Sequence, residues 1–195
     1  MHLLSEHKVF DQIFSGSKYH AQIAQRASIL IKFYAEEKKL GTPEIELLWA
    51  TAQKEESAKL NIYKLISENG HVLESEVLEA LVEKIDQMEP TVVTQRDLKF
   101  LFDLARKSFR NTKPKEAAFE VLWHIASLSK RGYAKEILEP SRTHLADLIR
   151  TAENSTKDLY AQKCCEIIGN HSDERSSLQA IIILHEILQT FQRHK

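Results

Sequence analysis

Apolar residues recur along this chain with the spacing of amphipathic helices and are separated by short polar turns. In the segment 42–54, Thr42 can cap a helix whose first residue is Pro43. Its apolar residues on one face are Ile45, Leu48, Trp49 and Ala52. No segment alternates apolar and polar residues over a useful length, as a half-buried strand would. The pattern therefore predicts helices with one buried face.

The helix at 42–54 has a partial repeat further along the chain. When Trp49 is aligned with Trp123, an offset of 74 residues, Leu48 and Ala52 also meet identical residues, and Pro114 begins the second helix much as Pro43 begins the first. An offset of this length corresponds to about two helix hairpins. We therefore expect stacked helical pairs around one continuous core, with both tryptophans in that core.

The remaining helices are predicted from apolar stripes and from turn residues. Thr94 and Asp97 resemble a capping box, and Pro140-Ser141 interrupts the pattern, so that a short helix is expected before it and a new one after it. The other predicted helices cover residues 2–14, 19–38, 58–68, 75–88, 94–109, 114–128, 156–168 and 172–192. Residues 1–195 are thus expected to form one all-α domain, or a segment of a longer array: an armadillo- or HEAT-like α-solenoid of about ten antiparallel helices.

The last predicted helix is apolar on all sides, from Leu178 to Phe191. Such a helix needs cover on more than one face. We therefore expect either that the natural protein continues past Lys195 or that a partner docks there.

Composition narrows the class of protein. With 43% apolar residues, five glycines and four prolines, the chain suits long helices joined by short turns. Its longest apolar run, Ala180 to Leu184, is five residues, and we expect no membrane span. The N-terminus lacks the blocks of a signal peptide, and Cys164 and Cys165 are adjacent. A cytoplasmic or nuclear location is therefore expected.

Charge is divided unevenly between the two halves of the chain. Residues 1–94 carry 10 Lys and Arg against 15 Asp and Glu, whereas residues 95–195 carry 17 against 13. There is no strong basic excess of the kind that a nucleic-acid binder shows, so we expect protein partners and no nucleic acid. The densest basic cluster comprises Arg106, Lys107, Arg110, Lys113 and Lys115. Cations suit a helix C-terminus, but the cluster is also our candidate surface for an acidic partner.

Motifs for catalysis, metal binding or cofactor binding are missing. The nine histidines include no His-x-x-x-His pair, and no phosphate-binding loop or dinucleotide-binding glycine motif occurs. Cys164 and Cys165 point about 100° apart on a helix, which makes them poor joint ligands. A cysteine nucleophile with a distant histidine remains an alternative, although neither cysteine follows a glycine-rich approach. We therefore predict no catalytic, cofactor-binding or metal-binding residue.

Several segments resemble the helical N-terminal region of the large fat-facets-type ubiquitin carboxyl-terminal hydrolases. They are His20–Arg26, Leu30–Tyr34, Leu40, Glu44-Ile45 and Leu48–Gln53, followed by Val92–Asp103, Glu120–Trp123 and Asn154–Tyr160. After Gln53, Lys54-Glu-Glu-Ser57 replaces the Lys-His-type continuation of the family. The resemblance is therefore to a divergent member.

The resemblance implies a role without catalysis. Family members are cysteine isopeptidases that remove ubiquitin, and their papain-like catalytic domain lies downstream of this region. Its cysteine and histidine boxes have no counterpart here, and Ala161–Glu166 around the two cysteines lacks the glycine-rich approach. The resemblance thus implies a scaffold that shapes the enzyme and binds substrates or partners.

Three hypotheses follow for the chain. The first is a non-catalytic segment of a deubiquitinase, and the second is a stand-alone armadillo- or HEAT-like adaptor. The sequence beyond Lys195 separates these two. The third is a small cysteine hydrolase, which predicts that an electrophilic ubiquitin probe labels Cys164 or Cys165; we expect no labelling.

Overall fold

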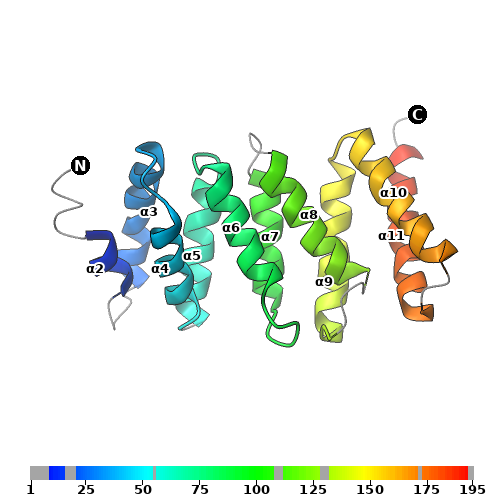
Figure 1. The fold of residues 1–195 in the computed structure, drawn as a ribbon, viewed down its shortest axis with the longest axis horizontal. Helices are drawn as coiled ribbons and strands as arrows, with labels where there is room; N and C mark the ends of the chain where they lie inside the picture. The colour runs from blue at the N-terminus through cyan, green and yellow to red at the C-terminus, as the bar shows by residue number, and fades with distance from the viewer. Residues whose placement is uncertain are drawn as a thin grey trace.

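The computed structural model describes residues 9–15, 21–54, 56–107, 112–127, 132–170 and 173–192. These residues form ten α-helices and no strand (Figure 1). The helices are α2 (Val9–Ser15), α3 (Ala21–Glu36), α4 (Thr42–Ala52), α5 (Glu56–Asn69), α6 (Ser75–Asp86), α7 (Gln95–Lys107), α8 (Thr112–Ala126), α9 (Lys135–Arg150), α10 (Asn154–Gly169) and α11 (Glu174–Gln192). The all-α prediction is confirmed. Residues 2–8 of the first predicted helix lie outside the described residues.

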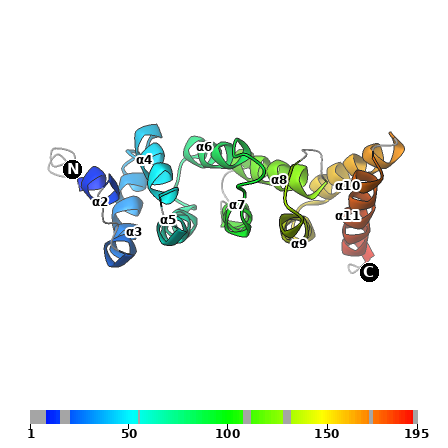
Figure 2. The ribbon, with the colours of Figure 1, turned by 90° about the horizontal axis from the view of Figure 1, so that it is seen from below.

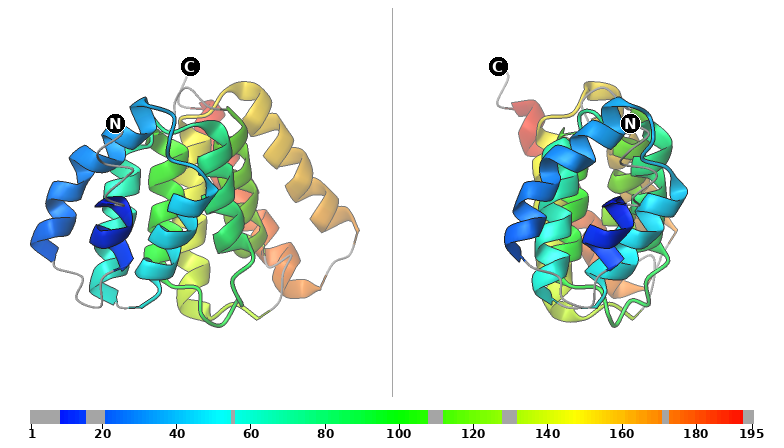
Figure 3. Two further views of the ribbon diagram at one scale, coloured as in Figure 1. Left: turned by 60° about the vertical axis from the view of Figure 1, so that its left-hand side comes forward. Right: turned by 90° about the vertical axis from the view of Figure 1, so that its left-hand side faces the viewer.

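The helices lie in two layers (Figure 2). Layer A contains α4, α6, α8 and α10, with α2 beside α4, and layer B contains α3, α5, α7, α9 and α11. Each of α4, α6, α8 and α10 packs on the helix that follows it, which makes four hairpins. Seen from its α2 end, the array shows the later hairpins behind the earlier ones (Figure 3). This is the predicted α-solenoid.

One apolar core runs between the layers. Its fully buried side chains come from the facing stripes of successive helices and include Ile45, Leu48, Ile62, Ile66, Leu78, Leu81, Ile85, Leu98 and Leu101. Between α5 and α7 the rings of Tyr63 and Phe100 stack with centroids 4.0 Å apart. Because each hairpin buries its stripe against the next one, the core is continuous along the stack.

The two tryptophans occupy corresponding helices, as the internal repeat predicts. Trp49 lies on α4 and Trp123 on α8, both in layer A and two hairpins apart. Trp123 is buried and meets the ring of Tyr160 of α10 at 5.5 Å. Trp49 is only partly buried and stacks on Tyr63 of its own hairpin at 6.3 Å. The equivalence of the helices is confirmed, whereas the full burial of both indoles holds for Trp123 alone.

The prediction that Pro140 divides two helices is wrong. Helix α9 runs unbroken through Pro140. Proline lacks the N–H that would bond the carbonyl of Glu136 four residues earlier. The side-chain amide of Gln95, from α7, instead donates to that carbonyl at 3.4 Å. A donor from the neighbouring hairpin thus partly satisfies the group that the proline leaves unbonded.

Several helix starts or caps also differ from the prediction. Helix α4 begins at Thr42, one residue early, and its N-cap is Gly41, whose N–H donates to Glu44 Oε2 at 3.0 Å. Helix α6 begins at Ser75 as expected, but its N-cap is Glu74 and no side chain caps it. The described part of α8 begins at Thr112, two residues before Pro114. Proline is tolerated in the first turn because the N–H groups there lack intrahelical acceptors.

Thr94 and Asp97 form the predicted cap, and Asp97 also binds two side chains of α5. Its Oδ2 accepts from the Thr94 N–H at 2.8 Å and from the Thr94 hydroxyl at 2.6 Å. The same carboxylate, which is completely buried, pairs with Lys59 Nζ at 2.8 Å and accepts from the Tyr63 hydroxyl at 2.7 Å. Burial, followed by the Asp97 charge, raises the pKa of Tyr63, so that the hydroxyl stays a donor. This buried network joins α5 to α7.

Helix α11 exposes apolar side chains, as its sequence indicates. Ala180, Ile183 and Ile187 are buried against α9 and α10, whereas Leu178, Ile181 and Leu188 are each about half exposed. The exposed three are spaced by three and seven residues and therefore share one face. Within the described residues, no helix is both long and apolar enough to cross a membrane.

Candidate protein-binding grooves

The two cysteines of α10 differ in their exposure. Cys164 is buried in α10, and this burial, with a smaller contribution from Cys165, raises the pKa of its thiol to about 12. A thiol with this pKa is protonated at neutral pH and is a poor nucleophile. Cys165 is exposed on the same helix. The described residues also contain no group of three His, Cys, Asp or Glu side chains placed to hold a metal ion.

The described members of the basic cluster do not converge on one groove. Arg106 is exposed in the last turn of α7, and Lys107 beside it lines a groove between α5 and α7. Lys115 lies on α8 and lines a different groove, against α10. Arg110 lies outside the described residues, and of Lys113 only the backbone in α8 is described. The role of the cluster in binding an acidic partner stays a prediction.

The groove that Lys107 lines is called here the B groove, because α5 and α7 belong to layer B. It has a volume of about 300 Å³, and its apolar residues are Leu60, Tyr63 and Phe100. Leu60, on α5, is 54% exposed. Half of this large side chain therefore faces solvent beside two buried aromatic rings.

Cations outnumber anions around the B groove. Its lining includes Lys64, Arg96, Lys99 and Lys107 against Glu68 and Asp103. Lys99 pairs with Asp103 at 3.3 Å, and the Lys99 side chain is 67% exposed. Surface pairs of this kind contribute little and exchange readily with other anions. The groove thus combines an exposed apolar side chain with a net positive rim.

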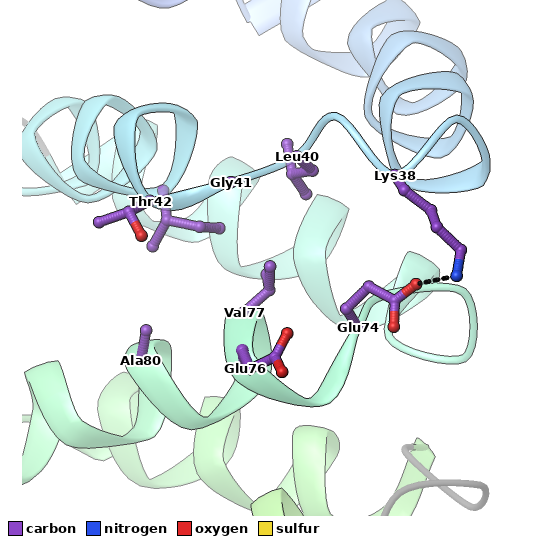
Figure 4. A pocket seen from close by; sticks show the side chains of 9 residues that line it. Lys38, Leu40, Gly41, Thr42, Glu74, Glu76, Val77 and Ala80 are labelled. Atoms are coloured by element: carbon purple, nitrogen blue, oxygen red, sulfur yellow. Dashed lines mark ion pairs between the residues drawn. The ribbon is translucent and has the colours of Figure 1, made fainter.

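Layer A contains two further grooves in equivalent places. The first lies between α4 and α6 and has a volume of about 440 Å³. In Figure 4, Thr42 and Leu40 lie on one side, and Val77 and Ala80 of α6 lie on the other. The ammonium group of Lys38, from the loop before α4, pairs with Glu74 at 3.4 Å at one end of this groove (Figure 4).

The second groove of layer A, called here the A groove, lies between α8 and α10 and has a volume of about 350 Å³. Phe119 and Tyr160 are its buried residues, whereas Leu159 is 48% exposed. Glu153 is the N-cap of α10 as Glu74 is that of α6, and both have the same extended backbone conformation. The two grooves are therefore related by the same repeat as the two tryptophans.

Sequence patterns did not predict these grooves. The B groove depends on which apolar residue of α5 faces outward, and the layer A grooves depend on the spacing between helices that are not adjacent in sequence. One signal was available: Glu74 and Glu153 each precede an apolar stripe, 79 residues apart, close to the 74-residue offset of the tryptophans. This spacing indicates that the two glutamates begin equivalent helices, but it does not indicate that a groove lies beside either helix.

Comparison with known proteins identifies the family. The family model described as the UBP24/USP9X/USP9Y ARM repeat matches residues 1–195. No curated protein and no solved structure matches the chain. The match covers the whole sequence and agrees with the stacked hairpins and with the resemblance of the segments between His20 and Tyr160. This chain belongs to the UBP24/USP9X/USP9Y ARM repeat family.

Proposed function

We propose that this chain is a non-catalytic scaffold of a ubiquitin-specific protease and that it binds a segment of a partner or substrate protein in the B groove. The bound segment carries acidic side chains beside a large apolar one. The observation that carries the proposal is the half-exposed Leu60 next to Tyr63 and Phe100, within a rim that contains four cations.

The geometry of the groove supports a partner of this chemistry. An apolar side chain of the partner would cover Leu60, which otherwise keeps about half of its surface in water. A neighbouring carboxylate would meet Lys107, for which no ion pair occurs among the described residues, or Lys99, whose pair with Asp103 is exposed. Rim charges of this kind mainly set the choice of partner and the rate of association.

The scaffold role is favoured over hydrolysis by the state of the two thiols. Cys164 is buried and has a raised pKa, and Cys165 projects from the middle of an exposed helix face. Neither lies in one of the three grooves described above. An electrophilic ubiquitin probe should therefore leave this chain unlabelled, and labelling of either cysteine would contradict the proposal.

A displayed peptide library tests the binding site. Selection on the purified chain should enrich peptides with Asp or Glu next to Leu or Phe. The variant Lys99→Glu/Lys107→Glu should lose at least tenfold in affinity for the enriched peptides, because both substitutions reverse rim charges. The variant Lys39→Glu/Lys54→Glu changes net charge equally at exposed positions away from the B groove and serves as the control. Equal loss in both variants, or enrichment without acidic residues, would refute the site.

A further inference from the structure

The A groove differs in charge from the B groove. Three glutamates, Glu116, Glu120 and Glu153, line it against the single cation Lys115. Its apolar surface comes from Phe119 and Tyr160, whose ring centroids are 5.7 Å apart, and from Leu159. It is thus an apolar slot with an acidic rim, on the layer opposite to the B groove.

One of the three glutamates is already held in place. Glu120 Oε1 accepts from the Tyr160 hydroxyl at 3.0 Å and pairs with the ammonium group of Lys163. The ammonium group also lies 4.9 Å from the centre of the Tyr160 ring. These contacts fix Tyr160 and Glu120 as a rigid wall of the slot, so that a ligand would find this surface preorganised.

The other two glutamates are available for pairing. Within the described residues, neither Glu116 nor Glu153 has a side-chain ion pair or hydrogen bond. In the equivalent groove, Glu74 occupies the position of Glu153 and is paired with Lys38 at 3.4 Å. In the groove between α4 and α6, the ammonium group of Lys38 thus already pairs with the N-cap carboxylate that corresponds to Glu153 (Figure 4).

We propose that the A groove binds a short peptide segment of another protein in which a large apolar side chain lies next to a lysine or arginine. The apolar side chain packs against Leu159 and the edges of Phe119 and Tyr160. The cation pairs with Glu153, in the place that Lys38 takes in the first groove, and a second cation is met by Glu116.

The size of the groove sets the size of the ligand. A volume of about 350 Å³ is at the lower end of the range of roughly 300–1,000 Å³ that holds small ligands, and it suits one large side chain with its neighbours. Contacts on so small an area give weak and reversible binding. Because the rim is exposed, the affinity should also fall as salt concentration rises.

Fluorescence anisotropy with three labelled peptides tests the proposal on the full chain. The peptides share glycine-serine flanks and differ in a central Lys-Leu-Arg, Lys-Gly-Arg or Glu-Leu-Glu. The Lys-Leu-Arg peptide should bind at least tenfold more tightly than each of the others, because it alone supplies both the apolar and the cationic groups. Equal binding of the two cationic peptides, or no binding of Lys-Leu-Arg at 1 mM, would overturn the proposal.

Matched variants locate the binding. Glu116→Gln/Glu153→Gln should weaken binding of the Lys-Leu-Arg peptide at least tenfold, whereas Glu89→Gln/Glu139→Gln, which changes the same charge at exposed positions elsewhere, should leave it within twofold. Leu159→Ser replaces a half-exposed side chain and should also weaken binding without unfolding the chain. Unchanged affinity in the Glu116/Glu153 variant would overturn the proposal. The Lys99→Glu/Lys107→Glu variant, which alters only the B groove, should bind the Lys-Leu-Arg peptide as the unchanged chain does. The two grooves are thus tested independently of each other.

Discussion

Replacing Asp97 by alanine tests whether the buried network ties α5 to α7. The two carboxylate oxygens of Asp97 accept from four donors: Lys59 Nζ, the Tyr63 hydroxyl, and the N–H and hydroxyl of Thr94. The substitution leaves the Lys59 ammonium group unpaired, although its side chain is only 6% exposed. Leaving one member of a buried ion pair alone costs about 3–5 kcal/mol, which includes the unsatisfied charge. For a chain of this length, that loss corresponds to a fall in Tm of about 6–20 °C.

A double substitution separates the unpaired charge from the lost cap. In Lys59→Met/Asp97→Ala the buried charge is gone, because both members of the pair have been removed. The double variant should therefore be more stable than Asp97→Ala alone, with a remaining deficit of about 0.5–2 kcal/mol from the lost cap at Thr94–Asp97 and about 1–3 kcal/mol from the Tyr63 hydroxyl that loses its acceptor. Asp103→Ala is the control on the same helix, since its partner Lys99 has a side chain that is 67% exposed and the pair contributes about 1 kcal/mol or less.

Thermal and urea unfolding followed by far-ultraviolet circular dichroism measure these differences. The reasoning is refuted if Asp97→Ala loses less than about 1 kcal/mol, or if the double variant is less stable than Asp97→Ala. It is also refuted if Asp103→Ala costs as much as Asp97→Ala, because burial would then not distinguish the two carboxylates.

Three further predictions concern single groups. Burial, followed by the Lys99 charge, lowers the pKa of His144 below its ordinary 6.5, so the unfolded chain binds this proton more readily. The free energy of unfolding should therefore fall as pH drops below about 6.5. It should fall less steeply in His144→Phe, which keeps an aromatic ring against Phe102 of α7, on which the His144 ring stacks with centroids 4.7 Å apart; equal pH slopes would contradict this. In a maleimide assay Cys165 should react quickly and Cys164 only on unfolding, and two equally fast thiols would be inconsistent with a buried Cys164. Pro140→Ala restores a helix hydrogen bond and should raise the free energy of unfolding by about 1–3 kcal/mol, whereas a loss of stability would show that the proline ring itself packs favourably.

Local patterns in the sequence were enough to predict the hairpins. In the predicted helix 75–88, Leu78, Leu81, Val82 and Ile85 have the spacing of one helix face, and all four are buried. The pair Thr94 and Asp97 forms its cap because both partners lie within one turn. Neighbouring residues determine these features, so the sequence of one segment suffices to predict them.

Features that depend on a neighbouring hairpin were not predictable in this way. Pro140 indicated a helix break, but its helix continues with a donor from Gln95, 45 residues earlier in the chain. Leu60 is apolar, yet it lies at the B groove and is 54% exposed. The candidate grooves share this origin. The sequence shows which charged residues α8 and α10 carry. It does not show the distance between these two helices, because packing across hairpins sets that distance.

Because the two tryptophans are buried to different extents, their intrinsic fluorescence can be used to follow unfolding of the chain. An indole partly in contact with water emits at longer wavelength than one enclosed in a core, so we expect Trp49 to emit at longer wavelength than Trp123. They lie two hairpins apart in a stack whose hairpins contact mainly their neighbours. Opening of the array from either end would thus change the emission of one indole before the other, and no dye needs to be attached to follow it.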